Sequence, residues 1–179
     1  MLGNTKQNIL LIETQRLKIC ETAGRLEELE AIFTDENTMY YYPQFLSNVA
    51  IGVKDFLDLL NNSGLYVFPF ILKATGKVIG FITLNNVEET CKRIEVGYFL
   101  ISSCWKRGYT REIVDAVITV LKNQEWHRIE ATVYSGNDAS IKVLEACGFT
   151  LEGVLRDKYL IHGKYHDDII YSIITKDIT

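Results

Sequence analysis

Residues 100–112 read LISSCWKRGYTRE and join an apolar, strand-like stretch to a helical segment through a short loop. The first backbone N–H groups of a helix have no partner inside it and lie at the positive end of its dipole, so they form an anion site. Gly108 has no Cβ and lets the backbone approach a ligand closely. Lys106, Arg107 and Arg111 add positive charge. The stretch therefore predicts a strand, a phosphate-binding loop and a helix.

Two other interpretations bear on this loop. It is also compatible with an ordinary helix N-terminus that carries three solvated basic residues. It fits neither G-x-x-x-x-G-K-[ST] nor G-x-G-x-x-G, which weighs against nucleotide hydrolysis and dinucleotide chemistry.

Elements on both sides of the loop follow from hydrophobic periodicity. Alternating, β-branched or aromatic runs predict strands, and apolar residues three or four apart predict helices. The expected strands are 9–20, 65–73, 77–85, 92–101, 128–134 and two within 154–175, joined through His162-Gly163; the expected helices are 24–34, 53–61, 110–123 and 138–147, the last ended by Gly148. This order predicts mixed α/β (α+β) layers around one central sheet.

Composition limits the function classes. The chain has 179 residues, 47% apolar and 23% charged, which predicts one globular domain over 1–179. No stretch of about 18 apolar residues and no secretory signal is found, so we expect a cytoplasmic protein that does not contact membranes. A net charge of −4 argues against nucleic-acid binding. The four cysteines lack zinc-type spacing, so we expect reduced thiols and no metal.

The loop resembles the acyl-coenzyme A pyrophosphate loop of the GNAT N-acetyltransferases. Their pattern is Q/R-x-x-G-x-G/A, and residues 105–110 read W-K-R-G-Y-T, so the middle glycine matches while Trp105 and Thr110 depart from the pattern. The form W-x-x-G-Y-x-x-E, from Trp105 to Glu112, is typical of the RimJ/RimL-type branch, the ribosomal-protein N-terminal acetyltransferases.

Further segments are similar to that branch, in the same order along the chain. They are the T-x-R-L start at 14–17, G-K-V-I-G-F-I at 76–82, E-V-G-Y at 95–98, and the string N-D-A-S at 137–140, V-L-E at 143–145, G-F at 148–149 and E-G at 152–153. The resemblance covers about residues 10–175. It implies a GNAT fold, in which a mostly antiparallel sheet contains one parallel strand pair that splays apart, here 92–101 and 128–134.

The resemblance also implies acetyl-CoA as the acetyl donor, with its pantetheine arm between the splayed strands and its phosphates on the loop. The implied donor-binding residues are Phe99, Leu100, Ile101, Arg107, Gly108, Tyr109, Thr110, Arg111, Asn137 and Ser140. Residue types alone make Asn137 a helix N-cap and put Ser140 in the first helical turn, and we expect both residues to combine the two roles.

Acetyl transfer to an amine calls for a base and an acid. Glu95 is the candidate base, through water; the alternative is a surface carboxylate paired with Arg93. Many family members use as acid a tyrosine seven residues after the asparagine, which is Leu144 here, so Ser140 is the candidate acid. Another carboxylate position of the branch falls on Tyr159, which leaves the base open, and orientation alone can supply much of the rate.

The acceptor site is expected between the first two helices and the last hairpin. Tyr40, Tyr41 and Tyr98 are the candidate acceptor-binding residues; Tyr42 and Phe45 extend the aromatic cluster, for which plain packing is the alternative. His162, His166 and Asp167 lie close in sequence, and we interpret these histidines as exposed loop residues rather than metal ligands.

Three functions fit these observations. The first is acetylation of a protein N-terminal amine, as on a ribosomal protein. The second is acetylation of a small amine such as a polyamine, an aminoglycoside or an amino acid. The acidic balance of the chain weakly favours a cationic amine as the acceptor in either case. The third is an acyl-coenzyme A-binding module without turnover. The sequence leaves the oligomeric state open, a homo-oligomer included.

Overall fold

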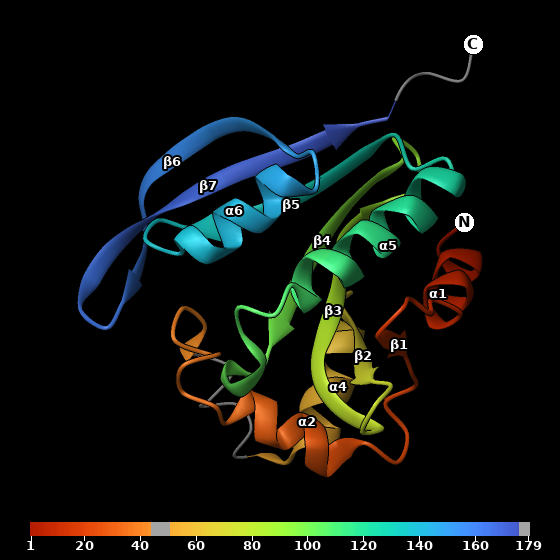
Figure 1. The fold of residues 1–179 in the computed structure, drawn as a ribbon. Coiled ribbons are helices and arrows are strands. Elements are labelled where there is room, and N and C mark those ends of the chain that lie inside the picture. The colour runs from red at the N-terminus through yellow and green to blue at the C-terminus, as the bar shows by residue number, and fades with distance from the viewer. Residues whose placement is uncertain (44–50, 176–179) are drawn as a thin grey trace.

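The computed structural model describes residues 1–43 and 51–175, which form a seven-stranded sheet with helices on both faces (Figure 1). In spatial order the strands are β1 (Leu17–Ile19), β2 (Tyr66–Leu72), β3 (Lys77–Glu88), β4 (Arg93–Leu100), β5 (Arg128–Tyr134), β7 (Lys164–Ile174) and β6 (Thr150–Ile161). Neighbouring strands are antiparallel except β4 and β5. The mixed α/β architecture predicted from the sequence is confirmed.

The helices divide between the two faces of the sheet. α1 (Leu2–Leu10), α5 (Tyr109–Asn123) and α6 (Asp138–Ala146) cover one side, here called the α5 face, and α2 (Leu26–Phe33) and α4 (Val53–Asn62) cover the other, the α4 face. Each face has its own hydrophobic core. The longest described helix, α5, has 15 residues, and no helix in the described part of the chain is long and apolar enough to cross a membrane.

The parallel pair β4–β5 opens along its length. Its register covers only three residue pairs, from Arg93↔Arg128 to Glu95↔Glu130. Both strands continue beyond that point, because β4 stays paired with β3 as far as Leu100 and β5 stays paired with β7 as far as Tyr134. The two halves of the sheet therefore diverge and leave a gap, as the predicted splayed pair requires.

Alternation along β5 decides what faces each side of this gap. Ile129, Ala131 and Val133 are buried in the core of the α5 face. Successive side chains of a strand point to opposite faces. The side chains of Thr132 and Tyr134 therefore point to the α4 face, which receives the polar side chains of β5.

The N-terminal segment differs from its prediction. Residues 2–10 form α1, whereas the strand predicted for 9–20 is confined to β1. Contacts with distant residues hold the helix: Ile9 is fully buried, and the indole Nε1 of Trp126 donates to Thr5 Oγ1 at 3.0 Å. Two buried residues in nine are too few to produce a clear helical period.

The remaining elements agree with the predictions within a few residues. β3 extends three residues beyond the predicted 77–85, and β6 begins at Thr150, earlier than the predicted 154. The predicted helix 138–147 is α6, and Gly148 follows it with φ +84°, the left-handed conformation expected there.

Candidate active site

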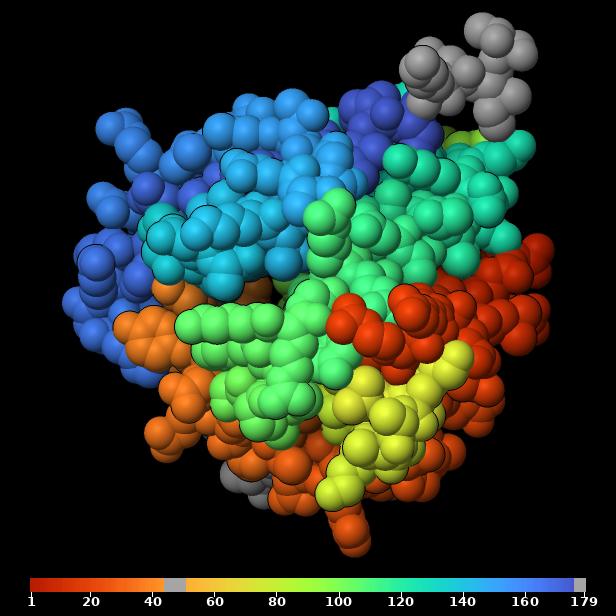
Figure 2. Space-filling view, viewed as in Figure 1, coloured from red at the N-terminus to blue at the C-terminus, as the bar shows by residue number. Residues whose placement is uncertain are grey.

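A cleft of about 630 Å³ lies between the loop before α5, the N-terminal turn of α6 and the diverging end of β4. Figure 2 shows it as a hollow between the segment of α6 (cyan) and the segment before α5 (green). Its lining residues include Thr38, Tyr40, Tyr41, Tyr42, Tyr98, Phe99, Leu100, Trp105, Lys106, Gly108, Tyr109, Thr110, Arg111, Asn137 and Ser140.

The loop before α5 leaves three backbone N–H groups available to bind an anion. Lys106 and Gly108 have φ of +60° and +76°, which turn the chain sharply into α5. The first recorded helical bond of α5 is from the Glu112 N–H to the Gly108 carbonyl, at 3.2 Å. The N–H groups of Tyr109, Thr110 and Arg111 precede it, so they have no carbonyl one turn back and lie at the positive end of the dipole.

Glu112 fixes this first turn to the start of the chain. Its carboxylate accepts from Thr14 Oγ1 at 2.6 Å, from the Arg16 N–H at 2.9 Å and from Arg16 Nε at 2.6 Å. Arg16 also donates through Nη1 to the Arg107 carbonyl at 2.9 Å, and its guanidinium lies 4.5 Å from the ring centroid of Tyr109. The T-x-R-L and W-x-x-G-Y-x-x-E segments, about 90 residues apart, therefore meet and hold the loop.

The pKa of Glu112 reflects this environment. Burial alone raises it, but the hydrogen bonds from Thr14 and Arg16 and the charge of the guanidinium outweigh burial, and the net shift is downward. Glu112 is thus a structural carboxylate that stays ionised.

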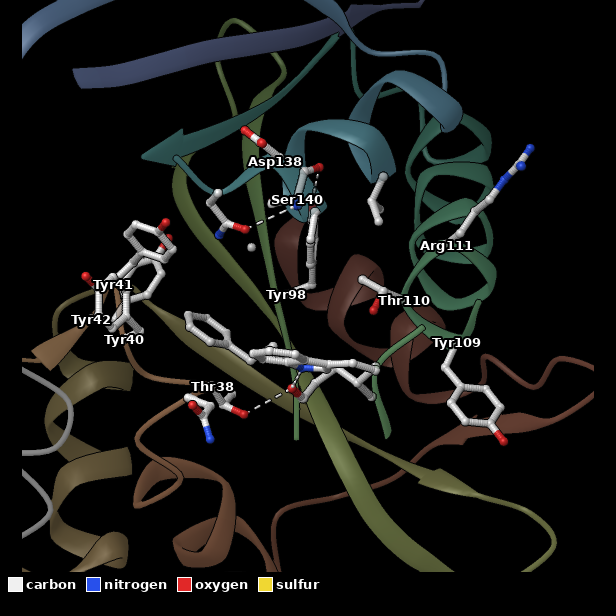
Figure 3. Close-up of a pocket in the computed structure, with 18 of the residues that line it drawn as sticks. Thr38, Tyr40, Tyr41, Tyr42, Tyr98, Tyr109, Thr110, Arg111, Asp138 and Ser140 are labelled. Carbon is white, nitrogen blue, oxygen red and sulfur yellow. Dashed lines mark hydrogen bonds between the residues drawn. The ribbon is translucent and has the colours of Figure 1, made fainter. Parts of the chain in front are cut away.

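The end of β4 is capped by side chains from outside the strand. The Leu100 carbonyl accepts from the indole Nε1 of Trp105 at 2.7 Å and from Thr38 Oγ1 at 3.2 Å (Figure 3). These bonds show that the Leu100 backbone faces away from β3 and into the gap. Trp105, which departs from the family pattern of the loop, thereby ties the loop to the strand.

The backbone groups of β4 alternate in direction. Ile101 donates its N–H to the Ile79 carbonyl at 2.9 Å, on the β3 side. Because neighbouring residues of an antiparallel strand alternate, Tyr98 and Leu100 turn their backbone groups to the gap, and Phe99 turns its own to β3. Of the three predicted arm-binding residues, Leu100 presents its backbone and Ile101 lies outside the lining. Phe99 belongs to the lining, and its ring packs against Tyr42 and Phe81.

The loop residues differ in what they present to the cleft. Tyr109 is 9% exposed, and its side chain points away from the cleft, so its backbone faces the anion site (Figure 3). The Arg111 side chain extends outward from α5, where its Nε lies 3.6 Å from Asp115. Arg107 is not part of the lining; its Nη2 lies 3.4 Å from the Ser103 carbonyl.

Asn137 and Ser140 open α6 at the edge of the cleft. The Asn137 side chain accepts from the Ser140 N–H at 3.2 Å, which confirms the N-cap. The Ser140 hydroxyl lies 2.8 Å from the Tyr98 hydroxyl, which is also 3.1 Å from the Ser140 carbonyl. Burial raises the pKa of Tyr98 well above its usual range, so the Tyr98 hydroxyl keeps its proton.

Tyrosines close the end of the cleft opposite α5 (Figure 3). The Tyr40 and Tyr41 rings are 4.9 Å apart, and Tyr42 packs against Phe99 at 4.9 Å and against Tyr134 at 5.0 Å. The cluster thus both lines the cleft and packs. Phe45, the other aromatic residue predicted here, lies outside the described residues.

The two histidines near the last turn have different environments. His162 donates from Nε2 to the Tyr40 carbonyl at 3.0 Å, because a carbonyl oxygen only accepts. His166 is 6% exposed and donates from Nδ1 to the Ser135 carbonyl at 2.8 Å. The interpretation as exposed loop residues is correct for His162. It is wrong for His166, because His166 belongs to β7 and its side chain is buried.

A second pocket, of about 280 Å³, opens on the α4 face of the same gap. The two pockets share five lining residues and meet between β4 and β5: Tyr42, Val96, Gly97, Phe99 and Thr132. The side chains found in the second pocket alone are mostly polar: Leu65, Thr83, Asn85, Asn86, Glu95, Tyr134, Lys158, Tyr159 and Asp168. We call it the polar pocket.

Glu95 points into the polar pocket. Its Oε2 accepts from Asn86 Nδ2 at 2.6 Å, and its Oε1 lies 3.4 Å from Thr132 Oγ1. The alternative pairing with Arg93 is not what the structure shows, because Arg93 Nη1 lies 4.0 Å from Glu130 instead. The hydrogen-bond partners of Glu95, Asn86 and Thr132, are therefore neutral groups beside the gap.

Asp168 is a polar-pocket residue that the sequence reasoning missed. It is 2% exposed, and its Oδ2 accepts from Lys158 Nζ at 2.6 Å. The available signal was an acidic residue at an alternating, inward position of the β7 segment, two residues after His166. Its partner Lys158 lies on a different strand, so the segment alone does not show the pair.

This arrangement can bring two reactants together from opposite faces. Backbone N–H groups and the glycine turn suit a diphosphate, and the gap beside Leu100 suits an extended arm. On the α4 face, carboxylates suit a cationic or hydrogen-bond-donating partner. The residues present therefore fit a coenzyme A thioester on one side and an amine on the other.

Comparison with known proteins agrees with this geometry. Residues 20–150 match the sequence profile of the acetyltransferase (GNAT) domain. The uncharacterized N-acetyltransferase YoaA of Bacillus subtilis (strain 168) is 29% identical over 172 residues, 92% of this chain and 96% of YoaA. The uncharacterized N-acetyltransferase p20 of Bacillus licheniformis is 31% identical over 129 residues, 69% of this chain and 72% of p20.

Solved structures share the fold. RimL, a ribosomal L7/L12 alpha-N-protein acetyltransferase solved in complex with coenzyme A, is similar with a TM-score of 0.76 at 19% identity, over 92% of this chain and 97% of that one. The profile match spans most of the chain and includes the anion loop, the splayed strands and the start of α6. The chain therefore belongs to the GNAT acetyltransferase family and is an N-acetyltransferase.

Proposed function

We propose that this acetyltransferase takes its acetyl group from acetyl-CoA and passes it to a primary amine, with the N-terminal amine of a protein as the leading acceptor. The observation that carries the proposal is the meeting of the cleft and the polar pocket in the β4–β5 gap. The structural neighbour RimL is named for a protein N-terminus and was solved with coenzyme A, which supports both parts.

The reaction needs a proton removed on one side and supplied on the other. The amine nitrogen bonds to the acetyl carbon while the C–S bond breaks. Glu95, beside the gap in the polar pocket, accepts the amine proton, directly or through water. Ser140 donates a proton to the leaving sulfur and regains one from solvent, and the Tyr98 hydroxyl, 2.8 Å away, holds the Ser140 hydroxyl in place.

A small amine is the second candidate acceptor. The polar pocket measures about 280 Å³ and has Glu95 and Asp168 in its wall. That volume is near the lower end of small-molecule sites, and its acidic groups favour a cationic ligand. A protein acceptor would place its first residue in the polar pocket, and the rest of its chain would extend out of the pocket into solvent.

The donor is tested by thermal unfolding with acetyl-CoA titrated to saturation. Binding to the folded chain alone must raise its unfolding temperature. An unchanged unfolding temperature removes acetyl-CoA from the account. Desulfo-coenzyme A serves as the control for phosphate binding without the thioester.

Turnover is tested separately, by thiol release and mass spectrometry with two acceptor sets. One set holds short peptides with free N-termini, and the other holds polyamines, aminoglycosides and amino acids. A stoichiometric gain of an acetyl group on peptides alone supports the protein acceptor, and a gain on small amines alone supports the second candidate. A chain that binds acetyl-CoA but acetylates neither set is a binding module, which contradicts the proposal.

A further inference from the structure

The Asp168 carboxylate keeps one oxygen without a partner. The residue is 2% exposed, and Lys158 Nζ lies 2.6 Å from its Oδ2. The other oxygen, Oδ1, is buried and has no hydrogen-bond partner among residues 1–43 and 51–175. A buried acceptor without a donor costs free energy, about 1–3 kcal/mol. Such an atom in a pocket wall points to a ligand that supplies the donor.

The surroundings of Asp168 hold it in place. It lies opposite Tyr134 in the β5–β7 register, and the Tyr134 ring packs edge-on against Tyr159 at 4.8 Å. Lys158 Nζ lies 5.0 Å from the centroid of the Tyr159 ring while it binds Oδ2. Lys158 thus holds the carboxylate in the wall of the polar pocket, and the packed rings of Tyr134 and Tyr159 lie beside this ion pair.

The two carboxylates of the polar pocket differ in charge balance. Asp168 is paired with a lysine, so its free oxygen needs a hydrogen-bond donor but no additional positive charge. Glu95 has the neutral donors Asn86 and Thr132 as its recorded hydrogen-bond partners. A charged amine is therefore better placed at Glu95, and a neutral N–H or O–H group is better placed at Asp168.

We infer that Asp168 determines acceptor specificity: its Oδ1 accepts a hydrogen bond from a second N–H or O–H group of the acceptor, carried on the same molecule as the acetylated amine. This rests on the proposed function. The substrate class is then a bifunctional amine, such as a peptide N-terminus with a hydroxyl side chain or an amino alcohol. Simple alkylamines lack the second group and are poor acceptors. Lys158 is a positioning residue that holds Oδ2.

The variant Asp168→Asn tests this directly. The asparagine carbonyl must face Lys158, because an ammonium group only donates, so the amide NH₂ takes the place of Oδ1. The substitution keeps the shape of the side chain and replaces the unpartnered acceptor Oδ1 with a donor. Asp58→Asn is the matched control, since Asp58 is an exposed aspartate paired with Lys54 at 3.0 Å on α4.

The measurement is kcat/KM for two matched acceptor pairs. They are 4-aminobutanol with pentylamine, and a serine-initiated peptide with its alanine-initiated counterpart. In the wild type the hydroxyl-bearing member of at least one pair has a kcat/KM that is higher by about tenfold or more. In Asp168→Asn this preference is lost through a higher KM for the acceptor. Pentylamine turnover and the KM for acetyl-CoA stay within about twofold of the wild-type values. The control Asp58→Asn matches the wild type.

Several results would overturn the assignment. These are no preference in the wild type, or an equal loss for both members of a pair in Asp168→Asn. If that variant does not fold, Lys158→Met replaces it: the unpaired carboxylate should then favour 1,4-diaminobutane over 4-aminobutanol relative to the wild type, and an unchanged ratio contradicts the inference. If no acceptor is turned over, the same ratios are measured as Kd by calorimetry with coenzyme A bound, which separates this inference from the proposed reaction.

Discussion

Ser140 and Tyr98 form a hydroxyl pair at the donor side of the gap. Ser140 belongs to the first turn of α6, where Asn137 caps the helix through the Ser140 N–H rather than through its hydroxyl. The hydroxyl is therefore available to a ligand and to Tyr98, 2.8 Å away. The cap and the proposed acid role use different atoms of one residue, so they can be tested apart.

Ser140→Ala is expected to lower kcat by about 10- to 100-fold, because general acid catalysis contributes on this scale or above. The Kd for acetyl-CoA should change by less than about threefold, since the backbone cap is kept. Tyr98→Phe should give a smaller loss of kcat, because Ser140 keeps its own proton. Stopped assays of thiol release check both variants, and an unchanged kcat in Ser140→Ala excludes the acid role.

Glu112 makes the stability of the loop depend on pH. The folded-state pKa of this carboxyl is lowered, because its hydrogen bonds from Thr14 and Arg16 outweigh the effect of burial. The stabilisation is complete above the unfolded pKa of about 4.3 and is lost as pH falls through the lower folded value.

Glu112→Gln removes the charge and keeps the size of the side chain. At about pH 7 we expect it to lower the free energy of unfolding by about 1.5–3 kcal/mol, the range for hydrogen bonds to charged groups. At about pH 3 the two proteins should approach each other in stability, because the wild-type carboxyl is then losing its charge. Urea denaturation at both pH values measures the difference, and a constant difference contradicts the assigned shift.

The loop and the first turn of α5 act as one element. Gly108 has φ +76°, and a Cβ there would lie 3.5 Å from Arg16 Nη2. Gly76, in the β2–β3 turn, has a similar φ of +69° and open space around it. A residue with a Cβ would be strained at either position, and only Gly108 lines the cleft.

Gly108→Ala and Gly76→Ala are therefore a matched pair. Both should lower the free energy of unfolding by about 1–2 kcal/mol, the cost of a left-handed conformation for alanine. Gly108→Ala alone should weaken acetyl-CoA binding, by about tenfold, because the loop then shifts under the phosphates. Calorimetric titration compares them; equal affinities in both variants would show that the loop does not bind the donor.

Elements were predictable from the sequence where periodicity or turn chemistry is local. The amphipathic α5, the alternating β5 and the glycine-ended α6 are examples, and the resemblance to the family added the splayed pair. α1 was missed because its position depends on Trp126, more than 100 residues away. Asp168 was missed for the same reason, since its partner and its pocket come from other strands.

At the scale of the molecule, the β4–β5 gap is an opening through the sheet. Strand pairing closes it at Glu95↔Glu130, and each strand then follows its own antiparallel partner. One face offers helix N-termini and a glycine loop, and the other offers carboxylates. In the function proposed above, acetyl-CoA enters from the first face and the amine from the second.

A crystal structure with coenzyme A bound tests this account most directly. It should show the diphosphate on the N–H groups of Tyr109, Thr110 and Arg111, the arm along Leu100, and the sulfur between Gly97 and Thr132, facing the polar pocket. A bound coenzyme whose sulfur lies outside the gap, or whose diphosphate lies away from the start of α5, would contradict it.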